Sequence, residues 1–571
     1  MSDQIQDRIA KLERIRALGV EPYGTRFTGI TRNAELRDIG DKLNIPAGQT
    51  AEGDGACFRA AGRVALFRDT GKLIFMTVRD WSGDIQWAIS KKAVEDGTGN
   101  REQAADGAGR GAQGAGSVGV SPARVAPSSG GTGVSPVPGS TLGESPFPDG
   151  PIAWQLAKLL DLGDIVGAFG RLGRTKTGEL TLWVSHIRLL SKAVRPPPEK
   201  WHGLTDVEAR YRKRYVDLLS NPESQRQFVV RAKIIDYARE VLRRRGFIEV
   251  ETPVLQPIYG GAAARPFVTH HNTLDMKLYL RISPELYLKR CLVGGLERVY
   301  EFARCFRNEG ISPRHNPEFT MLELYQAYGD YHDMMDITEA IIAGAARDVI
   351  GSYVVGKREQ GTGNREQTGS VGVSPAREDA IDFTPPWPRR RYGDLFAEHV
   401  GFAMTDAAAC RAKARELFAR KQISVDESKA DDAVVIGALF EHFVEDKLVN
   451  PTFVLDYPAP LCPLTKRAPK DRPDAPDLAL RFECFVNGME MGNAYSELND
   501  PKVQHDTFSA QLRGEGDETM AVMDEDYVEA LEYGLPPAGG LGIGIDRLCM
   551  LLTGSESIRE VLLFPLQRAQ T

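Results

Sequence analysis

The stretch "RVYEFARCFRNEGISPRHNPEFTMLELYQAY", residues 298–328, has two runs of alternating apolar residues on either side of a polar loop. This pattern predicts two antiparallel strands with a long connection. Period two then places polar side chains together on one face of each strand: Arg307 with Glu309, and Phe319 with Glu323 and Tyr325. Because a buried charge without partners is costly, we expect a polar ligand on this face, with a solvated sheet face as the alternative.

A second hairpin is predicted in "RFECFVNGMEMGNAYSEL", residues 481–498, where Asn-Gly separates two alternating runs. With a two-residue turn, Glu483 lies on the same face as Glu490, at roughly 7 Å across the ladder, and Gly492 faces Glu483. Two carboxylates so placed repel each other unless a cation joins them, and oxygen ligands of this kind suit Mg²⁺. The alternative is an exposed acidic face.

The stretch "GGLGIGIDRLCML", residues 539–551, has glycine at alternate positions and then an arginine. One face of the predicted strand is therefore bare backbone, which admits a flat ligand, while the apolar residues between the glycines pack inward. A helix from about Asp546 to Gly554 places Arg547 in its first turn, where side chain and helix dipole both attract anions. The spacing matches neither a dinucleotide fingerprint nor a P-loop, so a simple packing strand is the alternative.

The composition is that of an ordinary globular protein with a slight acidic excess. The chain has 571 residues and a formal net charge of -7, so a nucleic-acid partner would need local basic sites. Its seven cysteines form no C-x-x-C pair, which argues against zinc ribbons and disulfides and favours a reducing cytoplasm. The charged N-terminal stretch lacks an apolar signal region, and no window of about 18 uncharged apolar residues occurs, so we expect no membrane association.

The order of the patterns along the chain predicts several parts. Five short strands within residues 56–90 and 163–190 fit a small barrel, and the C-terminal part mixes helices with strands. Two stretches rich in Gly, Ser and Pro share the repeats "GTGNREQ" and "GSVGVSPAR", and we interpret both as inserted surface loops without function. The predicted parts are a helical extension at 1–55, the barrel domain at 56–192 with a disordered insertion at about 96–150, a linker at 193–213, and a large domain at 214–571 with an insertion at about 357–380.

Taken together, three of these segments resemble the motifs of class II aminoacyl-tRNA synthetases, and specifically lysyl-tRNA synthetases of the bacterial type. The helix in residues 225–246, with Val229, Ala232, Ile235, Val241 and Leu242 on a helical period, and "GFIEVETPVL" resemble motif 1, the dimer-forming element. "FRNEGISPRHNPEF" resembles motif 2 and "GLGIGIDR" motif 3. The resemblance implies an α+β fold: an N-terminal OB-fold anticodon-binding barrel, and a catalytic domain with an antiparallel sheet flanked by helices, in a homodimer.

The resemblance also implies an activity, the ATP-dependent activation of L-lysine to lysyl-adenylate. The lysyl group then passes to the 3′-terminal adenosine of tRNA-Lys, and AMP and pyrophosphate are released. Two to three Mg²⁺ ions would accompany ATP, with Glu483 and Glu490 as ligands. The residues implied for ATP are Arg307, Glu309, Arg314, His315, Phe319, Glu483 and Arg547, of which Arg307 and Arg547 are catalytic.

For the amino acid, charge balance agrees with the resemblance, because two ammonium groups need several carboxylates. The implied lysine-binding residues are Gly261, Glu285, Glu323, Tyr325, Asn493 and Glu497. Ala494 stands where the family usually has glycine, and its methyl is expected near the pocket.

In the barrel, the resemblance implies four residues for binding the U-rich anticodon: Arg68, Phe75, Gln86 and Glu179. Phe75 is expected to be the stacking platform or, alternatively, a core residue.

Three rival functions follow from the same motifs. A lysylating enzyme that modifies a translation factor would lack the anticodon barrel. An aspartate or asparagine synthetase would need cationic side chains or an amide-reading group in the pocket. A nucleic-acid-binding regulator that has lost catalysis would be expected to lose Arg307, Arg547 or the acidic pair, and all of these are present.

Overall fold

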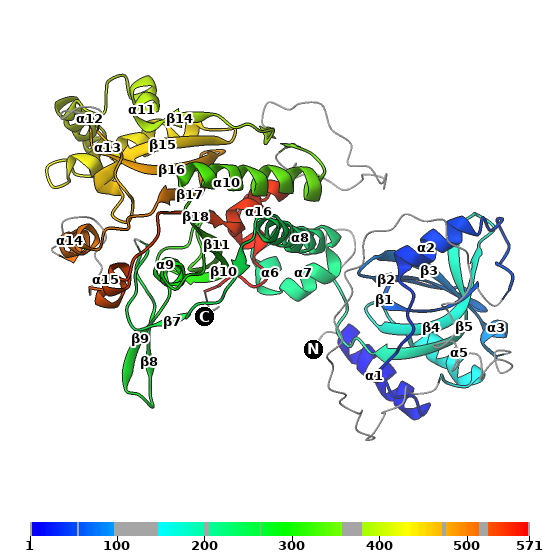
Figure 1. Cartoon of the computed structure of the whole chain (residues 1–571). Coiled ribbons are helices and arrows are strands. Elements are labelled where there is room, and N and C mark those ends of the chain that lie inside the picture. The colour runs from blue at the N-terminus through cyan, green and yellow to red at the C-terminus, as the bar shows by residue number, and fades with distance from the viewer. Residues whose placement is uncertain are drawn as a thin grey trace. The chain divides into compact units, whose positions relative to one another are not determined.

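The computed structural model (Figure 1) forms two compact units, Met1–His202 and Gly203–Thr571. Of the two predicted insertions, residues 96–146 and 357–379 lie outside the described part of the chain. Residues 147–150 were expected in the first insertion but belong to the fold, since Gly150 begins a helix and is buried. The structure describes residues 3–53, 56–95, 147–198, 204, 206–262, 264–356, 380–470, 476–512 and 523–568.

The N-terminal unit contains a closed five-stranded barrel, which confirms the predicted fold of this part. Its strands, in the order β1-β2-β3-β5-β4, are β1 (Cys57–Asp69), β2 (Leu73–Asp80), β3 (Gly83–Ser90), β4 (Ile165–Arg174) and β5 (Leu180–Ser191). Neighbours pair antiparallel except β3 and β5, which pair parallel. Along β2, Ile74, Met76 and Val78 are buried inside the barrel, so period two turns Phe75 outward.

Helices close the barrel and share its core. Ile15 and Leu36, from the first two helices, pack in the same hydrophobic cluster as the barrel interior. Trp154, which follows the first insertion, packs there too. The described helices of this unit are α1 (Asp3–Ala17), α2 (Asn33–Lys42), α3 (Lys91–Glu95) and α5 (Gly150–Leu159).

The second unit is organised around an eight-stranded sheet. Its order is β14-β15-β16-β17-β18-β11-β10-β6, and the six central strands pair antiparallel, while β14 and β6 pair parallel at the edges. The predicted antiparallel sheet is thus confirmed. Its strands are β6 (Ile248–Glu249), β10 (Arg298–Phe306), β11 (Glu318–Ala327), β14 (Arg389–Arg391), β15 (Thr452–Pro458), β16 (Leu478–Val486), β17 (Met489–Ser496) and β18 (Ala538–Gly544).

One face of this sheet is covered by α8 (Pro222–Arg244), α10 (Tyr331–Ala345) and α16 (Ile545–Thr553), which form a dry core with it. Figure 1 shows the three helices side by side along the sheet. The buried stripe of α8 is Ile234, Ala238 and Leu242, whereas Val229 is 46% exposed. The apolar face predicted for this helix is therefore partly wrong, because apolar residues lie on more than one side and the sheet selects which side is buried.

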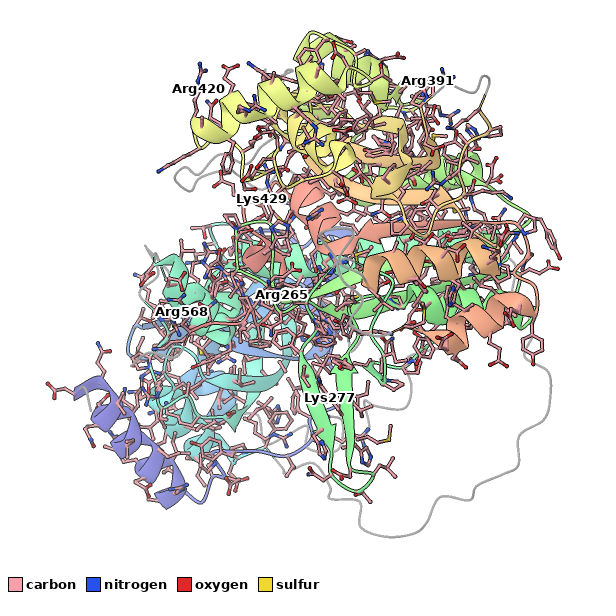
Figure 2. The ribbon with its side chains drawn as sticks, turned by 90° about the vertical axis from the view of Figure 1, so that its left-hand side faces the viewer. Arg265, Lys277, Arg391, Arg420, Lys429 and Arg568 are labelled. Carbon is pink, nitrogen blue, oxygen red and sulfur yellow. The ribbon has the colours of Figure 1, made fainter. Side chains whose placement is uncertain are left out.

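The opposite face of the sheet is covered at its two ends and is open between them. Helices α11 (Tyr392–Val400), α12 (Ala407–Ala419) and α13 (Asp432–Phe443) pack over β15 and β16. Helices α9 (Glu285–Val293), α14 (Pro501–Leu512) and α15 (Glu525–Glu532) pack beside β11. The α11–α13 group carries charged side chains on its surface, among them Arg420 and Lys429 (Figure 2). None of the helices in the described ranges is long and apolar enough to cross a membrane.

Smaller elements connect these layers. A three-stranded sheet, in the order β7-β9-β8, forms a projecting hairpin, and β7 and β8 flank the segment that contains Gly261. The remaining elements are α6 (Val207–Arg212), α7 (Arg214–Ser220), β7 (Leu255–Gln256), β8 (Val268–His271), β9 (Met276–Leu280), η3 (Ala346–Ile350), β12 (Val354–Val355), β13 (Ile381–Asp382), η4 (Glu445–Lys447), η5 (Ala459–Leu461) and α17 (Ile558–Val561).

Candidate active site

The open face of the sheet is polar because the strands alternate. On β11, Leu322 and Leu324 are buried in the helix-covered core, so Glu323 and Tyr325 lie on the other face. The glycines of β18 align with polar residues of both neighbouring strands: Gly542 with Glu323 and Asn493, and Gly540 with Tyr325 and Tyr495. Three strands therefore build one polar floor, with glycine along its middle.

The alternating glycines make room for side chains of the chain itself. A Cβ at Gly540 would lie 2.5 Å from the ring of Tyr325 and would also clash with Glu497, so no larger residue fits there. The backbones of Gly540 and Gly542 nevertheless both line open space.

Two adjoining cavities lie on this floor. The first, here called the acidic cavity, has a volume of about 350 Å³ and contains Glu285, Glu323 and Tyr325 in its lining. The second, here called the arginine cavity, has a volume of about 170 Å³. The residues that line both are Arg307, Met321, Asn493 and Gly542. A ligand in one cavity would therefore lie directly beside a ligand in the other.

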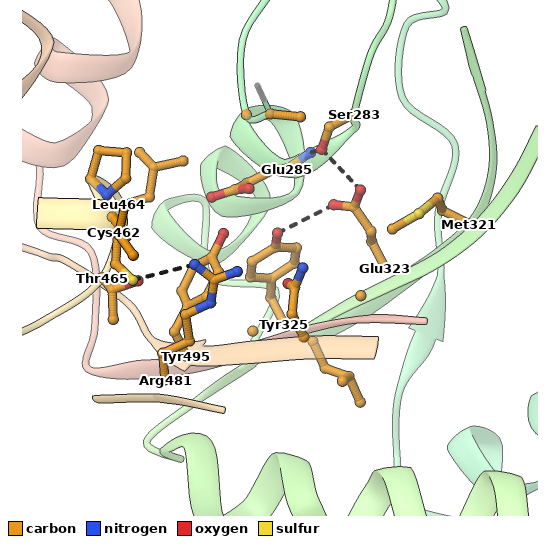
Figure 3. A pocket seen from close by; sticks show the side chains of 18 of the residues that line it. Ser283, Glu285, Met321, Glu323, Tyr325, Cys462, Leu464, Thr465, Arg481 and Tyr495 are labelled. Atoms are coloured by element: carbon orange, nitrogen blue, oxygen red, sulfur yellow. Dashed lines mark hydrogen bonds between the residues drawn. The ribbon is translucent and has the colours of Figure 1, made fainter. Parts of the chain in front are cut away.

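The acidic cavity is a hydrogen-bonded, buried carboxylate site (Figure 3). Ser283 Oγ donates to Glu323 Oε1 over 2.9 Å, and the Tyr325 hydroxyl donates to Glu323 Oε2 over 3.3 Å. Burial, together with the charge of Glu285, raises the pKa of Glu323 to about 8. A positively charged ligand would therefore be stabilised in this site.

Five of the six predicted lysine-binding residues line the acidic cavity: Gly261, Glu285, Glu323, Tyr325 and Asn493. Gly261 lies at the cavity edge with φ +83°, where a Cβ would be 2.9 Å from Cβ of Glu285. The sixth, Glu497, is not part of the lining. It is 1% exposed and forms an ion pair with Lys289, whose Nζ is 2.5 Å from its Oε2.

The arginine cavity gathers cations around an aromatic ring. The Arg307 guanidinium lies 5.1 Å from the centre of the Phe319 ring, and its Nε is buried without a hydrogen-bond partner among the described residues. Arg547, in the first turn of α16, donates to the backbone oxygen of Glu490 over 2.8 Å and lies 3.1 Å from His315 Nε2. Burial and the charge of Arg547 lower the pKa of His315, which stays neutral beside these cations.

The predicted ATP-binding residues, apart from Glu483, all line the arginine cavity: Arg307, Glu309, Arg314, His315, Phe319 and Arg547. The secondary structure that positions Arg307 and Glu309 at this cavity differs from the prediction. Strand β10 ends at Phe306, so Arg307 and Glu309 do not share a strand face. Arg307 keeps one further backbone hydrogen bond, from its N–H to the oxygen of Pro317, and the polar loop then leaves the sheet.

The β16–β17 hairpin has the predicted turn but a different register beyond it. Asn487 and Gly488 both have positive φ, and Val486 pairs with Met489 as expected. A bulge follows, so that Glu483 pairs with Asn493. The predicted pairing of Glu483 with Gly492 is therefore wrong, because a bulge sets two residues of one strand against one of the other and its position was not visible in the alternation.

The two carboxylates of this hairpin remain electrostatically coupled. Glu483 accepts hydrogen bonds from the Tyr457 hydroxyl over 2.9 Å and from Arg481, while Glu490 accepts from Asn493 Nδ2 over 2.8 Å. Burial raises the pKa of Glu483, Arg481 opposes the rise, and Glu490 adds to it. No group of three metal-ligating side chains occurs within the described ranges, so a cation here would depend on this pair and on its other ligands from substrate or water.

Ala494 does not lie near the acidic cavity. Its side chain is fully buried in the core on the helix-covered face, next to Leu541 and Phe482. The expected methyl near the pocket is therefore wrong, since Asn493 and Tyr495 face the cavity and the residue between them must face away.

A separate cavity lies on the barrel. It has a volume of about 720 Å³, and all four predicted anticodon residues line it: Arg68, Phe75, Gln86 and Glu179. Arg68 pairs directly with Phe75 across β1 and β2, and Gln86 accepts a hydrogen bond from Thr181 Oγ1 over 2.8 Å. Phe75 is half-buried and outside the hydrophobic core, so its alternative interpretation as a core residue is wrong.

The sequence analysis missed several polar residues of the site. Arg481 and Tyr495 line the acidic cavity, and the strand alternation that selected Glu483 and Asn493 would also have selected them. Lys289 follows Glu285 by one helical turn, a spacing that signals a paired lysine on a predicted helix. Ser283 had no comparable signal, because it lies in a loop.

Comparison with known proteins agrees with this geometry. Residues 206–568 match the family model described as "tRNA synthetases class II (D, K and N)". The lysine–tRNA ligase of Carboxydothermus hydrogenoformans is 44% identical over 100% of this chain and 98% of its own length. The lysine–tRNA ligases of Staphylococcus haemolyticus and Dehalococcoides mccartyi are 41% and 40% identical, covering 100% and 98% of this chain and 99% and 96% of their own lengths. The chain therefore belongs to the lysine–tRNA ligase family of class II tRNA synthetases.

Proposed function

We propose that this chain activates L-lysine with ATP and transfers the lysyl group to the 3′-terminal adenosine of tRNA-Lys. The observation that carries the proposal is the junction of the two cavities, where the acidic cavity and the arginine cavity share Arg307 in their walls. A cationic amino acid and an anionic nucleotide placed in them would meet at a guanidinium. The names of the relatives, all lysine–tRNA ligases, support the same activity.

In this proposal the acidic cavity takes lysine. Glu285 and Glu323 accept hydrogen bonds from its ammonium groups, and Tyr325 and Asn493 add polar contacts. Gly261 contributes backbone contact from the segment at the cavity edge. Glu497 supports the site from behind through its ion pair with Lys289. Aspartate fits poorly, because its carboxylate would face carboxylates.

The arginine cavity takes ATP. Adenine lies over Phe319, with Arg547 on its other side and Glu309 at its amino group. Arg314, His315 and Arg547 hold the distal phosphates, and Arg307 contacts both the α-phosphate and the carboxylate of lysine. That carboxylate oxygen attacks the α-phosphorus, the bond to the β-phosphate oxygen breaks, and pyrophosphate leaves. The nucleophile is already ionised, so the chain supplies positioning and positive charge and no general base.

Mg²⁺ is part of the proposal, with two to three ions accompanying ATP and Glu483 and Glu490 as protein ligands. The residues present fit it, since two carboxylates of one hairpin lie beside the arginine cavity and the charge of Glu490 helps to raise the pKa of Glu483. Bound there, the ion would neutralise phosphate charge during displacement. Glu490 lines the arginine cavity directly, whereas Glu483 is held behind it by Tyr457 and Arg481.

The barrel binds the anticodon of tRNA-Lys, and its presence disfavours an enzyme that lysylates a translation factor. A homodimer completes the proposal, on the strength of the motif 1 segment at residues 246–255. A reducing cytoplasm agrees with seven cysteines that are all free thiols.

The proposed function is tested by ATP–pyrophosphate exchange. Lysine should support exchange and aspartate should not, whereas equal exchange with aspartate, or none with lysine, would refute the assignment.

Lysine binding should release protons and strengthen with pH. The pKa of Glu323 is raised to about 8 in the free site, and a bound ammonium would lower it, so binding below pH 8 expels a proton. We expect the KM for lysine to fall as pH rises from about 6 to about 8 and then to level off. The free energy of unfolding changes with pH in the opposite direction. Because folding raises the pKa of Glu323 from its usual 4.5 to about 8, its contribution to stability is fully present below pH 4.5 and is lost as pH rises through about 8.

Calorimetry of lysine binding in two buffers of different ionisation enthalpy would measure the released protons directly. Glu323→Gln cannot titrate and should remove most of the release. Proton release that is unchanged in this variant would contradict the role of Glu323.

Replacing Phe75 by alanine should weaken tRNA binding without touching the chemistry. Loss of one base-stacking platform costs about 1–3 kcal/mol, so the KM for tRNA should rise by about tenfold or more. Lysine-dependent pyrophosphate exchange needs no tRNA and should be unchanged. Trp81→Ala is the matched control, an exposed aromatic on the same barrel outside the cavity lining. Equal tRNA constants for the two variants would show that Phe75 is not a base platform.

A further inference from the structure

Lys289 is a buried cation behind the wall of the acidic cavity. It is 0% exposed, and its Nζ lies 2.5 Å from Glu285 Oε1 and 2.5 Å from Glu497 Oε2. Lys289 does not line the cavity, whereas Glu285 does. It therefore reaches a bound amino acid through the carboxylates that it holds and not by contact.

The charge balance of the site depends on this residue. Three carboxylates, Glu285, Glu323 and Glu497, lie close together in a buried region, and ionised groups buried without counter-charge cost several kcal/mol. Within the described part of the chain, Lys289 is the one cation that pairs with Glu497. Burial raises the pKa of Glu497, and Lys289 opposes that rise.

The surroundings keep Lys289 charged and fixed. Its Nζ lies 5.8 Å from the ring centre of Tyr325 and 5.4 Å from that of Tyr495, both of which line the cavity. Burial alone would lower the pKa of Lys289, but Glu285 and Glu497 raise it above the usual value. The titratable groups that face it come from four sides: Glu285 of α9, Tyr325 of β11, Tyr495 of β17 with Glu497 directly after it, and Tyr527 of α15.

We propose that Lys289 is a specificity-determining positioning residue, an internal counter-ion that orients Glu285 and Glu497 so that the acidic cavity accepts a cationic amino acid. The inference rests on the proposed lysine activation. The ammonium of Lys289 offsets one carboxylate permanently, and the remaining negative charge is left for the substrate. Without Lys289, Glu285 in the cavity lining and Glu497 behind it would lose their paired cation, and the buried site would take up protons and attract lysine less.

Lys289→Met tests this, because methionine keeps the apolar stem and removes the charge. At pH 7 the KM for lysine should rise by about tenfold or more, while kcat and the KM for ATP stay within about twofold. The KM for lysine should also fall more steeply with pH than in the wild type, since additional protons must leave before lysine binds. Lys502→Met is the matched control, an exposed lysine in another i,i+4 pair, with Asp506, and should behave as wild type.

The outcomes separate two failures. If the wild type shows no lysine-dependent exchange, the proposed function fails. If the wild type is active and Lys289→Met leaves both the KM for lysine and its pH dependence unchanged, the role of Lys289 is refuted. Parallel losses in the constants for lysine and ATP, with an unchanged pH profile, would indicate a merely structural role and would also refute it.

A pair of variants keeps the test open if Lys289→Met does not fold. Lys289→Met with Glu497→Gln removes both buried charges, so no unpaired ion remains with Glu497. Compared with Glu497→Gln alone, in which Lys289 still holds Glu285, the double variant should show the steeper fall of the KM for lysine with pH. Equal slopes in the two variants would overturn the inference.

Discussion

Arg307→Ala should lower lysine-dependent pyrophosphate exchange by about 10³-fold, with no loss of folding. The guanidinium lines both cavities and has a buried Nε without a hydrogen-bond partner among the described residues, so it is poised for a ligand and not for the fold. During attack, negative charge grows on the phosphoryl oxygens, and a cation fixed at that position acts mainly in the transition state. Initial rates of exchange at saturating lysine and ATP would measure the loss.

The matched control for this variant is Arg304→Ala. Arg304 lies three residues earlier, in β10, but it is exposed and pairs with Glu318 at 3.3 Å, so its removal should leave exchange near normal. The thermal midpoints of both variants should stay close to that of the wild type. Near-normal exchange in Arg307→Ala would show that this residue does not act in catalysis. Loss of folding in this variant would show that it has a structural role.

Glu490→Gln should raise the Mg²⁺ concentration needed for half-maximal exchange by about 100-fold. The carboxylate of Glu490 lines the arginine cavity and is coupled to Glu483, so an amide in its place removes one of the two charges that would hold the ion. The change is isosteric, and the hydrogen bond with Asn493 can be retained by the amide oxygen. Exchange measured across a Mg²⁺ titration separates this effect from a simple loss of kcat.

The control for the metal prediction is Glu416→Gln, an exposed carboxylate of α12 that pairs with Lys413. Its Mg²⁺ dependence should match that of the wild type. A Glu490→Gln enzyme with a normal Mg²⁺ requirement would show that the acidic pair serves another purpose. EDTA should abolish exchange in every variant that is active with Mg²⁺.

Alternation along single strands was enough to predict much of the site. The polar residues Glu323 and Tyr325, separated by the buried Leu324, could be assigned to one face before any tertiary contact was known. The Asn-Gly turn at residues 487–488 was equally local, because positive φ at two successive positions needs these residue types. The five-stranded barrel followed from strand count and turn signals.

Features that depend on tertiary contacts could not be predicted in this way. The bulge in β17 changed the partner of Glu483, and no local pattern marks where an extra residue enters a strand. Ala494 was expected near the pocket only from the resemblance, because it stands where the family usually has glycine, although it faces the core. Glu497 was identified as an acceptor, but its pairing with Lys289 joins a strand end to a helix that is about 200 residues earlier in the chain.

The wall shared by the two cavities has a consequence for inhibitors. A single compound that joins a cationic tail to a planar, anionic head through a short stable link could fill both chambers at once. Such a compound loses translational and rotational freedom only once, so its affinity can exceed that of either fragment by a large factor. Selectivity would then be sought in the carboxylate-lined chamber and potency in the link that passes Arg307.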